Sequence, residues 1–262
     1  MSELKVPTMA EMMAAGEKPE VLFWVGCAGS FDDRAKKITK AIVKILNNCN
    51  VKFAVLGTEE SCTGDPAKRA GNEFLFQMQA MMNIQVLDGY EIKKIVTACP
   101  HCFNTLKNEY PGLGGNYEVI HHTQLIQQLF ADGKLTVEGG EFKGKKITFH
   151  DPCYLGRAND VYEAPRSVLQ KLDAELVEMK RCKSKGLCCG AGGAQMFKEA
   201  EPGNKEVNVE RTEEALETNP NIIATGCPFC NTMMTDGVKN FNKENDIQVL
   251  DIAEMIASAS DL

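Results

Sequence analysis

Short apolar runs rich in β-branched and aromatic residues alternate along the chain with longer segments whose apolar positions recur every three to four residues. The first run, "VLFWV", precedes a stretch in which Ala41, Ile42, Ile45 and Leu46 keep helical spacing. Further short runs follow at "VKFAVL", "KKIVTA" and "YEVIHH", with helical patterns between them. Strands that alternate with helices predict parallel sheets built from βαβ units, so the predicted fold class is α/β.

The same order of elements occurs twice. In the second half "GKKITFHDPCYLGR" matches "KPEVLFWVGCAGSF" of the first half, and "NIIATGCPFC" matches "KKIVTACPHC". We therefore expect two tandem, similar domains at residues 20–132 and 145–257, each a small parallel sheet with cysteines at its strand ends. The boundary falls near residues 133–145, a segment rich in glycine and charge.

Cysteines recur at matched positions in the two copies. Thirty-four residues separate Cys27 from Cys62, and thirty-four separate Cys153 from Cys188. Each copy closes with a Cys-Pro-x-Cys pair, and the second copy carries an additional cysteine directly after Cys188. Two such sets inside a repeat predict bound metal. The expected ligands are Cys27, Cys62, Cys99 and Cys102 in the first copy, and Cys153, Cys188, Cys189, Cys227 and Cys230 in the second.

The number of thiolates bears on the choice of metal. Four thiolates suit tetrahedral zinc and iron–sulfur clusters alike. Five thiolates exceed what a mononuclear zinc ion uses, whereas a cluster of several irons has a place for the fifth. The glycines of "CCGAGG" permit unusual backbone angles and let main-chain N–H groups approach the sulfur atoms.

Composition narrows the class of protein further. Eleven cysteines in a chain without a secretory signal indicate metal or redox chemistry, because cytosolic thiols stay reduced. The net charge of −7 gives no electrostatic basis for binding nucleic acid. No stretch reaches the ~20 apolar residues of a membrane helix. We expect a cytoplasmic chain with no membrane span of its own, held at the inner face of the membrane only through a partner.

The second copy resembles a known family. Its pattern is Cys153–x34–Cys188-Cys189-Gly190–x35–Gly226-Cys227-Pro-Phe-Cys230, with the phrases "HDPCYLGR" and "CCGAGG". It is similar to the cysteine-rich "CCG" domain of heterodisulfide reductase. Relatives of that domain occur in the iron–sulfur subunits of anaerobic glycerol-3-phosphate dehydrogenase, glycolate oxidase and the lactate-utilisation system. The resemblance extends from about residue 20 to about residue 257.

The resemblance implies a 4Fe–4S cluster at the second motif, either cubane or of the noncubane type that heterodisulfide reductase uses. The cluster would be bound by the five cysteines of that motif, with Cys188 and Cys189 as the catalytic residues. The first copy departs from the pattern because "SCTG" places Thr63 where the second copy has Cys189. Its four cysteines fit either a 4Fe–4S cluster or zinc.

The resemblance also implies an oxidoreductase subunit that works in a complex. Many family members carry a ferredoxin-like stretch that this sequence lacks, so a separate ferredoxin-like iron–sulfur subunit is expected, together with a flavoprotein or a quinone-linked membrane subunit. Three functions remain open. The chain passes electrons between a partner dehydrogenase and an acceptor, reduces a disulfide at the second cluster, or binds zinc as a scaffold.

Three other features lead to local predictions. His150 precedes the first cysteine of the second motif, where it either orients the loop or supplies a proton. The apolar run at 74–82 is predicted as a core-facing helix surface. The charged stretch at 198–220 is predicted as a solvated loop and helix surface.

Overall fold

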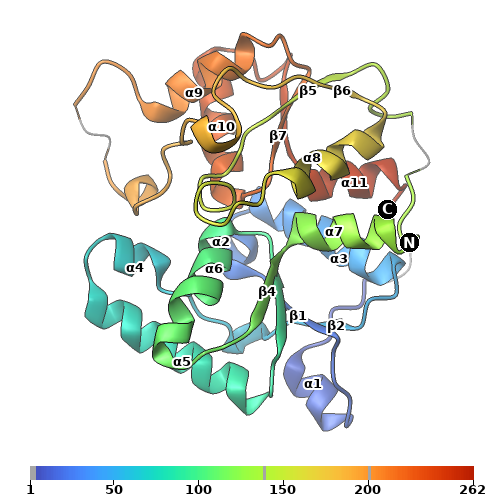
Figure 1. Cartoon of the computed structure of the whole chain (residues 1–262), viewed down its shortest axis with the longest axis vertical. Helices are drawn as coiled ribbons and strands as arrows, with labels where there is room; N and C mark the ends of the chain where they lie inside the picture. Colours follow the sequence, from blue (N-terminus) through green and yellow to red (C-terminus); the bar gives the residue numbers. More distant parts are fainter. Residues whose placement is uncertain (1–3, 138–139, 200–201) are drawn as a thin grey trace.

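The computed structural model describes residues 4–137, 140–199 and 202–262. It contains two four-stranded parallel sheets, one in each half of the chain (Figure 1). The first has the order β2-β1-β3-β4 and the second the order β6-β5-β7-β8. The strands are β1 (Val21–Trp24), β2 (Phe53–Ala54), β3 (Lys94–Thr97), β4 (Glu118–His121), β5 (Lys146–Phe149), β6 (Glu175–Leu176), β7 (Ile222–Thr225) and β8 (Gln248–Asp251).

Helices connect and cover these strands, as the alternating pattern predicted. They are α1 (Met9–Ala14), α2 (Gly26–Phe31), α3 (Ala35–Asn48), α4 (Asp65–Arg69), α5 (Glu73–Gly89), α6 (Pro100–Asn104), α7 (His122–Ala131), α8 (Glu163–Leu169), α9 (Val207–Leu216), α10 (Pro228–Asn240) and α11 (Ile252–Ala259). Within the described ranges, no helix combines the length and the apolar composition that a membrane crossing needs. The predicted α/β class with two similar halves is confirmed.

The strand order creates a crevice in each sheet. The chain runs from β1 outward to β2, then returns to place β3 on the other side of β1. The register pairs Trp24 with Thr97 at the carboxyl ends of these two strands, and the second sheet repeats the arrangement with β5 and β7. In open α/β sheets, sites form where the order reverses in this way. The two crevices are therefore the places where the fold presents side chains for chemistry.

The two halves share one hydrophobic core. Helices α3 and α7 of the first half pack against α11 and α8 of the second, in the middle of Figure 1. Ile45 and Leu129 from the first half join Phe149 and Ile256 from the second in a single buried cluster. Because α3 corresponds to α8 and α7 to α11 in the repeat, the contact relates the halves by an approximate two-fold axis.

Polar contacts fix the relative position of the halves. The Arg34 guanidinium donates to both carboxylate oxygens of Glu254 at 2.8 Å and to the Val249 carbonyl oxygen at 2.9 Å. His122 Nε2 lies 3.0 Å from Asp251 Oδ1, and both side chains are fully buried. Bidentate pairs of this kind are directional, so the halves are held in one orientation.

The apolar run at 74–82 is only half buried, and its prediction as a core face is wrong for the outer side of α5. Phe76 and Ala80 are buried, whereas Phe74, Met81 and Met82 are exposed. The physical reason is that α5 is apolar around most of its circumference, and the rest of the chain covers only one side. A helix of that composition is ordinarily covered all round.

The predicted boundary segment at 133–145 lies between the two sheets. Residues 138 and 139 fall outside the described residues. On either side of them, Leu135 and Phe142 are buried in the shared core. The domain limits at 20–132 and 145–257 stay predictions.

Candidate metal centre

The first group of cysteines gathers at the carboxyl edge of the first sheet. Cys27 follows β1 at the start of α2, and Cys62 lies in the loop after β2. Cys99 and Cys102 follow β3 at the start of α6. The Cys27 thiol interacts with Cys62, and the Cys102 thiol interacts with Cys99. The Glu60 carboxylate accepts hydrogen bonds from the backbone N–H groups of Val25 and Gly26, at 2.9 and 2.6 Å. These bonds hold the loop that leads into Cys27.

The second group occupies the matching edge of the second sheet. Cys153 follows β5, the doublet lies in the loop after β6, and Cys227 and Cys230 begin α10. Side-chain interactions run from Cys153 to Cys188, from Cys188 to Cys189, and on to Cys230. Cys230 in turn interacts with Cys227. The structure thus places all five thiols of the second motif next to one another.

A glycine after each loop cysteine has the same role in both halves. Gly64 N–H donates to Cys62 Sγ at 3.5 Å, and Gly190 N–H donates to Cys188 Sγ at 3.3 Å. Both glycines have positive φ, +90° and +93°. A side chain is strained in that conformation. The glycines of the motif are therefore explained by the backbone geometry that points an N–H group at sulfur.

Thr63 takes the position of the missing fifth cysteine. Its hydroxyl donates to Cys102 Sγ at 3.8 Å, and the side chain is buried. In the second half, Cys189 makes the corresponding contact with Cys230. The first centre therefore has four thiols and one hydroxyl where the second has five thiols.

The two centres meet at the interface between the halves. Cys99 of the first interacts directly with Cys227 of the second. His121 Nε2 lies 3.2 Å from the Ala98 carbonyl oxygen and 3.0 Å from that of Gly226. Burial lowers the pKa of His121 well below its usual value, so the neutral ring donates its one N–H to these two loops. Sequence reasoning had no means of finding this contact, since 105 residues separate the partners.

His150 lies against the second group. One of its ring nitrogens is within 4.8 Å of the sulfur atoms of Cys189 and Cys230. Arg211 Nε donates to His150 Nδ1 at 3.0 Å. Arg211 is fully buried, although it belongs to the stretch at 198–220 that was predicted as solvated. That prediction is wrong for the inner face of α9, where Arg211 contacts His150. Residues 200 and 201 of the stretch lie outside the described residues.

The loop cysteines after β2 and after β6 share one electrostatic feature. A hydrogen bond from Cys27 lowers the pKa of Cys62 to about 7, and a hydrogen bond from Cys153 lowers that of Cys188. Burial lowers the pKa of His101, but the Asp65 carboxylate and the Cys99 thiolate more than offset this and raise it overall. Hydrogen bonds to neighbouring thiols and burial raise the pKa of Cys102 and of Cys230. Each centre therefore combines a thiol of lowered pKa with one of raised pKa.

These residues fit a metal held by sulfur. Thiolates are soft ligands that suit zinc and iron–sulfur clusters, and they do not suit magnesium or calcium. Main-chain N–H groups that donate to ligand sulfur, as Gly64 and Gly190 do here, are a feature by which proteins tune iron–sulfur clusters. Buried nitrogen donors with no partner among the described residues, His150 Nε2 and Arg211 Nη2, add to the demand for an anionic acceptor at the second centre.

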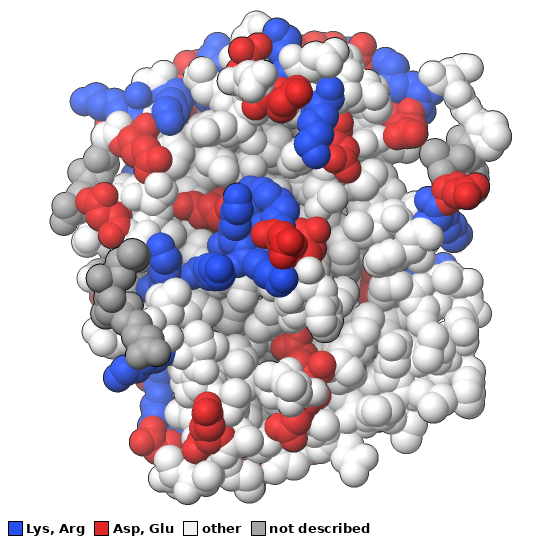
Figure 2. Space-filling view, turned by 180° about the vertical axis from the view of Figure 1, so that it is seen from behind, with Lys and Arg blue, Asp and Glu red and all other residues white. Residues whose placement is uncertain are grey.

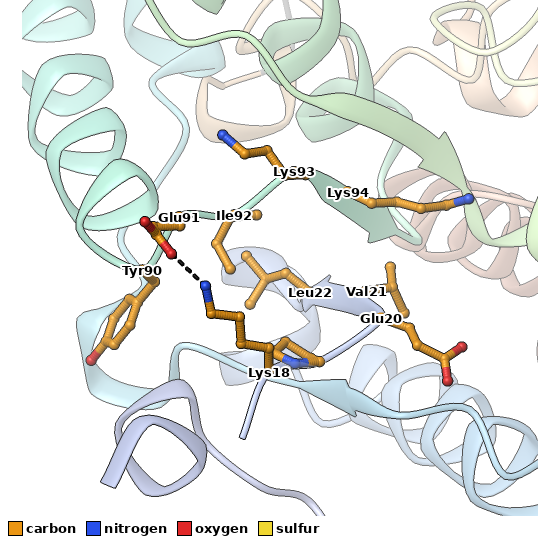
Figure 3. Close-up of a pocket in the computed structure, with 10 residues that line it drawn as sticks. Lys18, Glu20, Val21, Leu22, Tyr90, Glu91, Ile92, Lys93 and Lys94 are labelled. Carbon is orange, nitrogen blue, oxygen red and sulfur yellow. Dashed lines mark hydrogen bonds and ion pairs between the residues drawn. The ribbon is translucent and has the colours of Figure 1, made fainter. Parts of the chain in front are cut away.

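Two of the cavities among the described residues differ in their relation to the thiol centres. One of about 320 Å³ opens at the amino ends of β1 and β3, where Lys18 pairs with Glu91 (Figure 3). No cysteine lines it, so it is separate from the thiol centres. Another of about 500 Å³ is lined by Gly190, Met196 and Met233. The two methionines pack against the buried cysteines of the second centre, so this cavity adjoins it.

A parallel sheet with thiols at its switch point, present twice, defines a repeated cysteine-rich domain. The family model described as "CCG: Cysteine-rich domain" matches residues 21–107 and 147–235. The chain belongs to this family, and the resemblance seen in the sequence is confirmed.

Three curated relatives are named as oxidoreductases or reductases. The chain is 46% identical over 258 residues to a "Probable iron-sulfur-binding oxidoreductase FadF" of Bacillus subtilis. The match covers 98% of this chain and 36% of the relative. The chain is 45% identical to the "EtfAB:quinone oxidoreductase" of Syntrophomonas wolfei, covering 93% and 35%. It is 35% identical to one subunit of the "Dihydromethanophenazine:CoB--CoM heterodisulfide reductase" of Methanosarcina barkeri, covering 93% and 59%. The chain thus spans between about one third and three fifths of these relatives.

The acidity of Cys62 leads to a test on metal-free protein kept anaerobic. Thiolate is the form that alkylates, so modification of Cys62 should reach half its maximal rate near pH 7. Burial raises the pKa of Cys182, which lies outside both centres, so its modification should need a higher pH. Cys27→Ala removes the hydrogen-bond donor and should move the Cys62 profile to higher pH. Peptide mass spectrometry after iodoacetamide treatment measures the extent of modification of each cysteine against pH. A Cys62 midpoint no lower in pH than that of Cys182 contradicts the hydrogen bond from Cys27 to Cys62.

Proposed function

We propose that this chain is the iron–sulfur redox subunit of an oxidoreductase complex, passing electrons between a partner and an acceptor. The observation that carries the proposal is the closeness of Cys99 and Cys227: His121 Nε2 lies 3.2 and 3.0 Å from the carbonyl oxygens of Ala98 and Gly226, the residues that precede them, and each thiol shifts the pKa of the other. It joins the two thiol groups into one continuous path across the interface of the halves. A structural metal site has no use for such a path, whereas an electron relay depends on short separations.

The second centre would hold a 4Fe–4S cluster through its five cysteines, and the first a 4Fe–4S cluster or zinc through its four. A bound cluster supplies one-electron chemistry at each centre. The chain's own residues position the thiolates, donate N–H bonds to sulfur through Gly64 and Gly190, and exclude water by burying Cys99 and Cys227. The glycines and Thr63 thus determine where each sulfur lies.

The outer face of α5 is where we place the iron–sulfur partner. Phe74, Met81 and Met82 are 76%, 61% and 60% exposed, and Leu75 and Met78 extend the same face. No charged residue lies between Glu73 and Asp88. In Figure 2 the lower right flank, the side on which α4 and α5 lie, carries almost no charged side chain.

The size of this face favours a redox encounter over a stable dimer. Its exposed side chains offer roughly 500 Å², so a contact would bury about 1,000 Å² in total, within the range of transient electron-transfer complexes and below the ~1,600 Å² of stable ones. Asn83, on the inner face of α5, donates to the Cys62 carbonyl oxygen at 2.9 Å. A partner on the outer face is then separated from the first centre by about one helix diameter, ~10 Å.

The names of the relatives support a chain of partners. One relative is called a quinone oxidoreductase, and quinones reside in membranes. We therefore place the chain at the cytoplasmic face, attached through a quinone-linked partner, with a ferredoxin-like protein connecting the two. A flavoprotein would stand at the other end, because no dinucleotide motif is present in this sequence.

A second candidate function is disulfide reduction at the second centre. The cavity of about 500 Å³ beside Gly190 favours it, because a disulfide substrate needs a route to the thiolates. Cys188 and Cys189 would then contact the substrate. Two electrons and two protons convert one disulfide to two thiols, and the electrons would arrive through the first centre.

Metal content tests the proposed function first. Anaerobically purified protein should carry about eight irons, with matching acid-labile sulfide and no zinc, if both centres hold 4Fe–4S clusters. About four irons with one zinc would make the first centre structural. Cys189→Ser should alter the iron content and EPR signal of the second centre alone, and Cys182→Ser serves as the matched control. Zinc without iron, after reconstitution, contradicts the redox function.

Charge placed on α5 tests the docking face. Met81→Glu should slow electron transfer from a reduced two-cluster ferredoxin about tenfold or more, because a carboxylate must be desolvated in the contact. Met13→Glu is the control, since Met13 is equally exposed at 62% on α1. Stopped-flow absorbance measures the rate, and sedimentation shows the oligomeric state. Equal rates in both variants, or a wild-type dimer that Met81→Glu dissociates, would assign the face to something other than this partner.

Filling the cavity distinguishes the second candidate. Met233→Trp should reduce turnover of a small disulfide, with reduced methyl viologen as donor, by about tenfold while ferredoxin oxidation continues. Met13→Trp again serves as the control. Absence of disulfide turnover in the wild type leaves electron transfer as the function.

A further inference from the structure

Trp24 and His150 occupy the same position in the two halves. Each residue lies three positions before the first cysteine of its motif, at the carboxyl end of β1 and just after β5. Both side chains are completely buried. Each also has a ring nitrogen without a hydrogen-bond partner among the described residues, Nε1 in Trp24 and Nε2 in His150.

Trp24 is the one tryptophan of the chain and lies against the first centre. It lines a small cavity together with Cys27, Cys62 and Cys102. The indole nitrogen can only donate, and a buried donor without an acceptor is costly, so the position indicates that an acceptor belongs there. The Asp65 carboxylate also lines this cavity, but its two oxygens already accept from Arg69 and face His101. The sulfur atoms of the centre are therefore the acceptors that this donor suits.

His150 also has a ring nitrogen that must donate and has no partner, but the reason lies in its contact with Arg211. Arg211 Nε can only donate, so His150 Nδ1 must accept. The neutral ring therefore carries its proton on Nε2, the nitrogen without a partner. A proton on Nε2 excludes this nitrogen as a metal ligand and makes it a donor, on a ring that has one nitrogen within 4.8 Å of the sulfur atoms of Cys189 and Cys230.

The distribution of unpartnered nitrogen donors supports this interpretation. Within the part of the chain that the structure describes, buried side-chain nitrogens without a partner are Trp24 Nε1, His122 Nδ1, His150 Nε2 and Arg211 Nη2. His122 belongs to the polar tie between the halves, where its Nε2 lies 3.0 Å from Asp251 Oδ1. The remaining donors all belong to the thiol centres, since Arg211 bonds to His150.

We propose that Trp24 and His150 are matched positioning residues that donate an N–H bond to the sulfur of the cluster in their own half. The inference rests on the proposed function and adds a reason why the two centres differ in reduction potential. Hydrogen bonds to sulfur raise the reduction potential of an iron–sulfur cluster. The His150 donor is polarised by the Arg211 cation and the Trp24 donor is not, so the second centre has the higher potential of the two. Electrons entering beside α5 then move toward the second centre.

Three variants of the cluster-loaded protein test the proposal by EPR-monitored redox titration. Trp24→Phe keeps an aromatic ring and removes the N–H, and it should lower the potential of the first centre alone. His150→Asn keeps an acceptor for Arg211 but is too short to reach the cluster, and it should lower the potential of the second centre alone. His150→Gln carries an amide N–H to the position of Nε2 and should restore most of the shift.

The unaltered protein provides a second measurement that does not depend on the folding of the variants. With ¹⁵N-tryptophan, pulsed EPR of the reduced first centre should detect one ¹⁵N coupling and one exchangeable proton, because the chain has a single indole. Unshifted potentials in Trp24→Phe and His150→Asn, or no indole coupling, overturn the inference while the clusters themselves stand. Zinc at the first centre overturns the Trp24 half. Wild-type protein without iron contradicts the proposed function instead.

Discussion

Nine thiol groups lie where the edges of the two sheets meet, and the rest of the structure depends on this placement. Any thiolate formed there needs a nearby group that compensates its negative charge. Ionised sulfur inside a protein needs N–H donors or cations nearby. The chain supplies donors from several sides: Gly64 and Gly190 donate from the backbone, the Asp65 carboxylate raises the pKa of His101, and the buried Arg211 orients His150. The glycine-rich loops and the strand order 2-1-3-4 are the means by which the backbone reaches this arrangement.

Repetition of one domain explains both the likeness and the difference between the centres. Matched glycines and matched strand ends give each half the same framework. Side chains at equivalent positions then diverge: Thr63 faces Cys102 where Cys189 faces Cys230, and Trp24 stands where the second half has His150. Two centres of different character arise from one backbone geometry, and this difference suits the electron transfer proposed above.

The shared core and the exposed α5 face describe how such a chain fits into a larger assembly. The chain spans 36%, 35% and 59% of the length of these relatives, so they contain parts that it does not match. The core between the halves holds the two centres in contact, with Arg34 and Glu254 as a directional tie. The apolar outer face of α5 lies at the other side of the first centre, where an additional module has access to it.

The sequence by itself determined the α/β class, the repeat and the identity of the nine cysteines, because hydrophobic period and residue spacing are local properties. It did not determine which face of α5 is covered, because both faces are apolar and the pattern does not indicate which one packs against the rest of the chain. The contact of Cys99 with Cys227, the bond from Arg211 to His150 and the tie through His121 join residues far apart in sequence. Only tertiary packing places these residues together, because the interface between the halves depends on the shape of both.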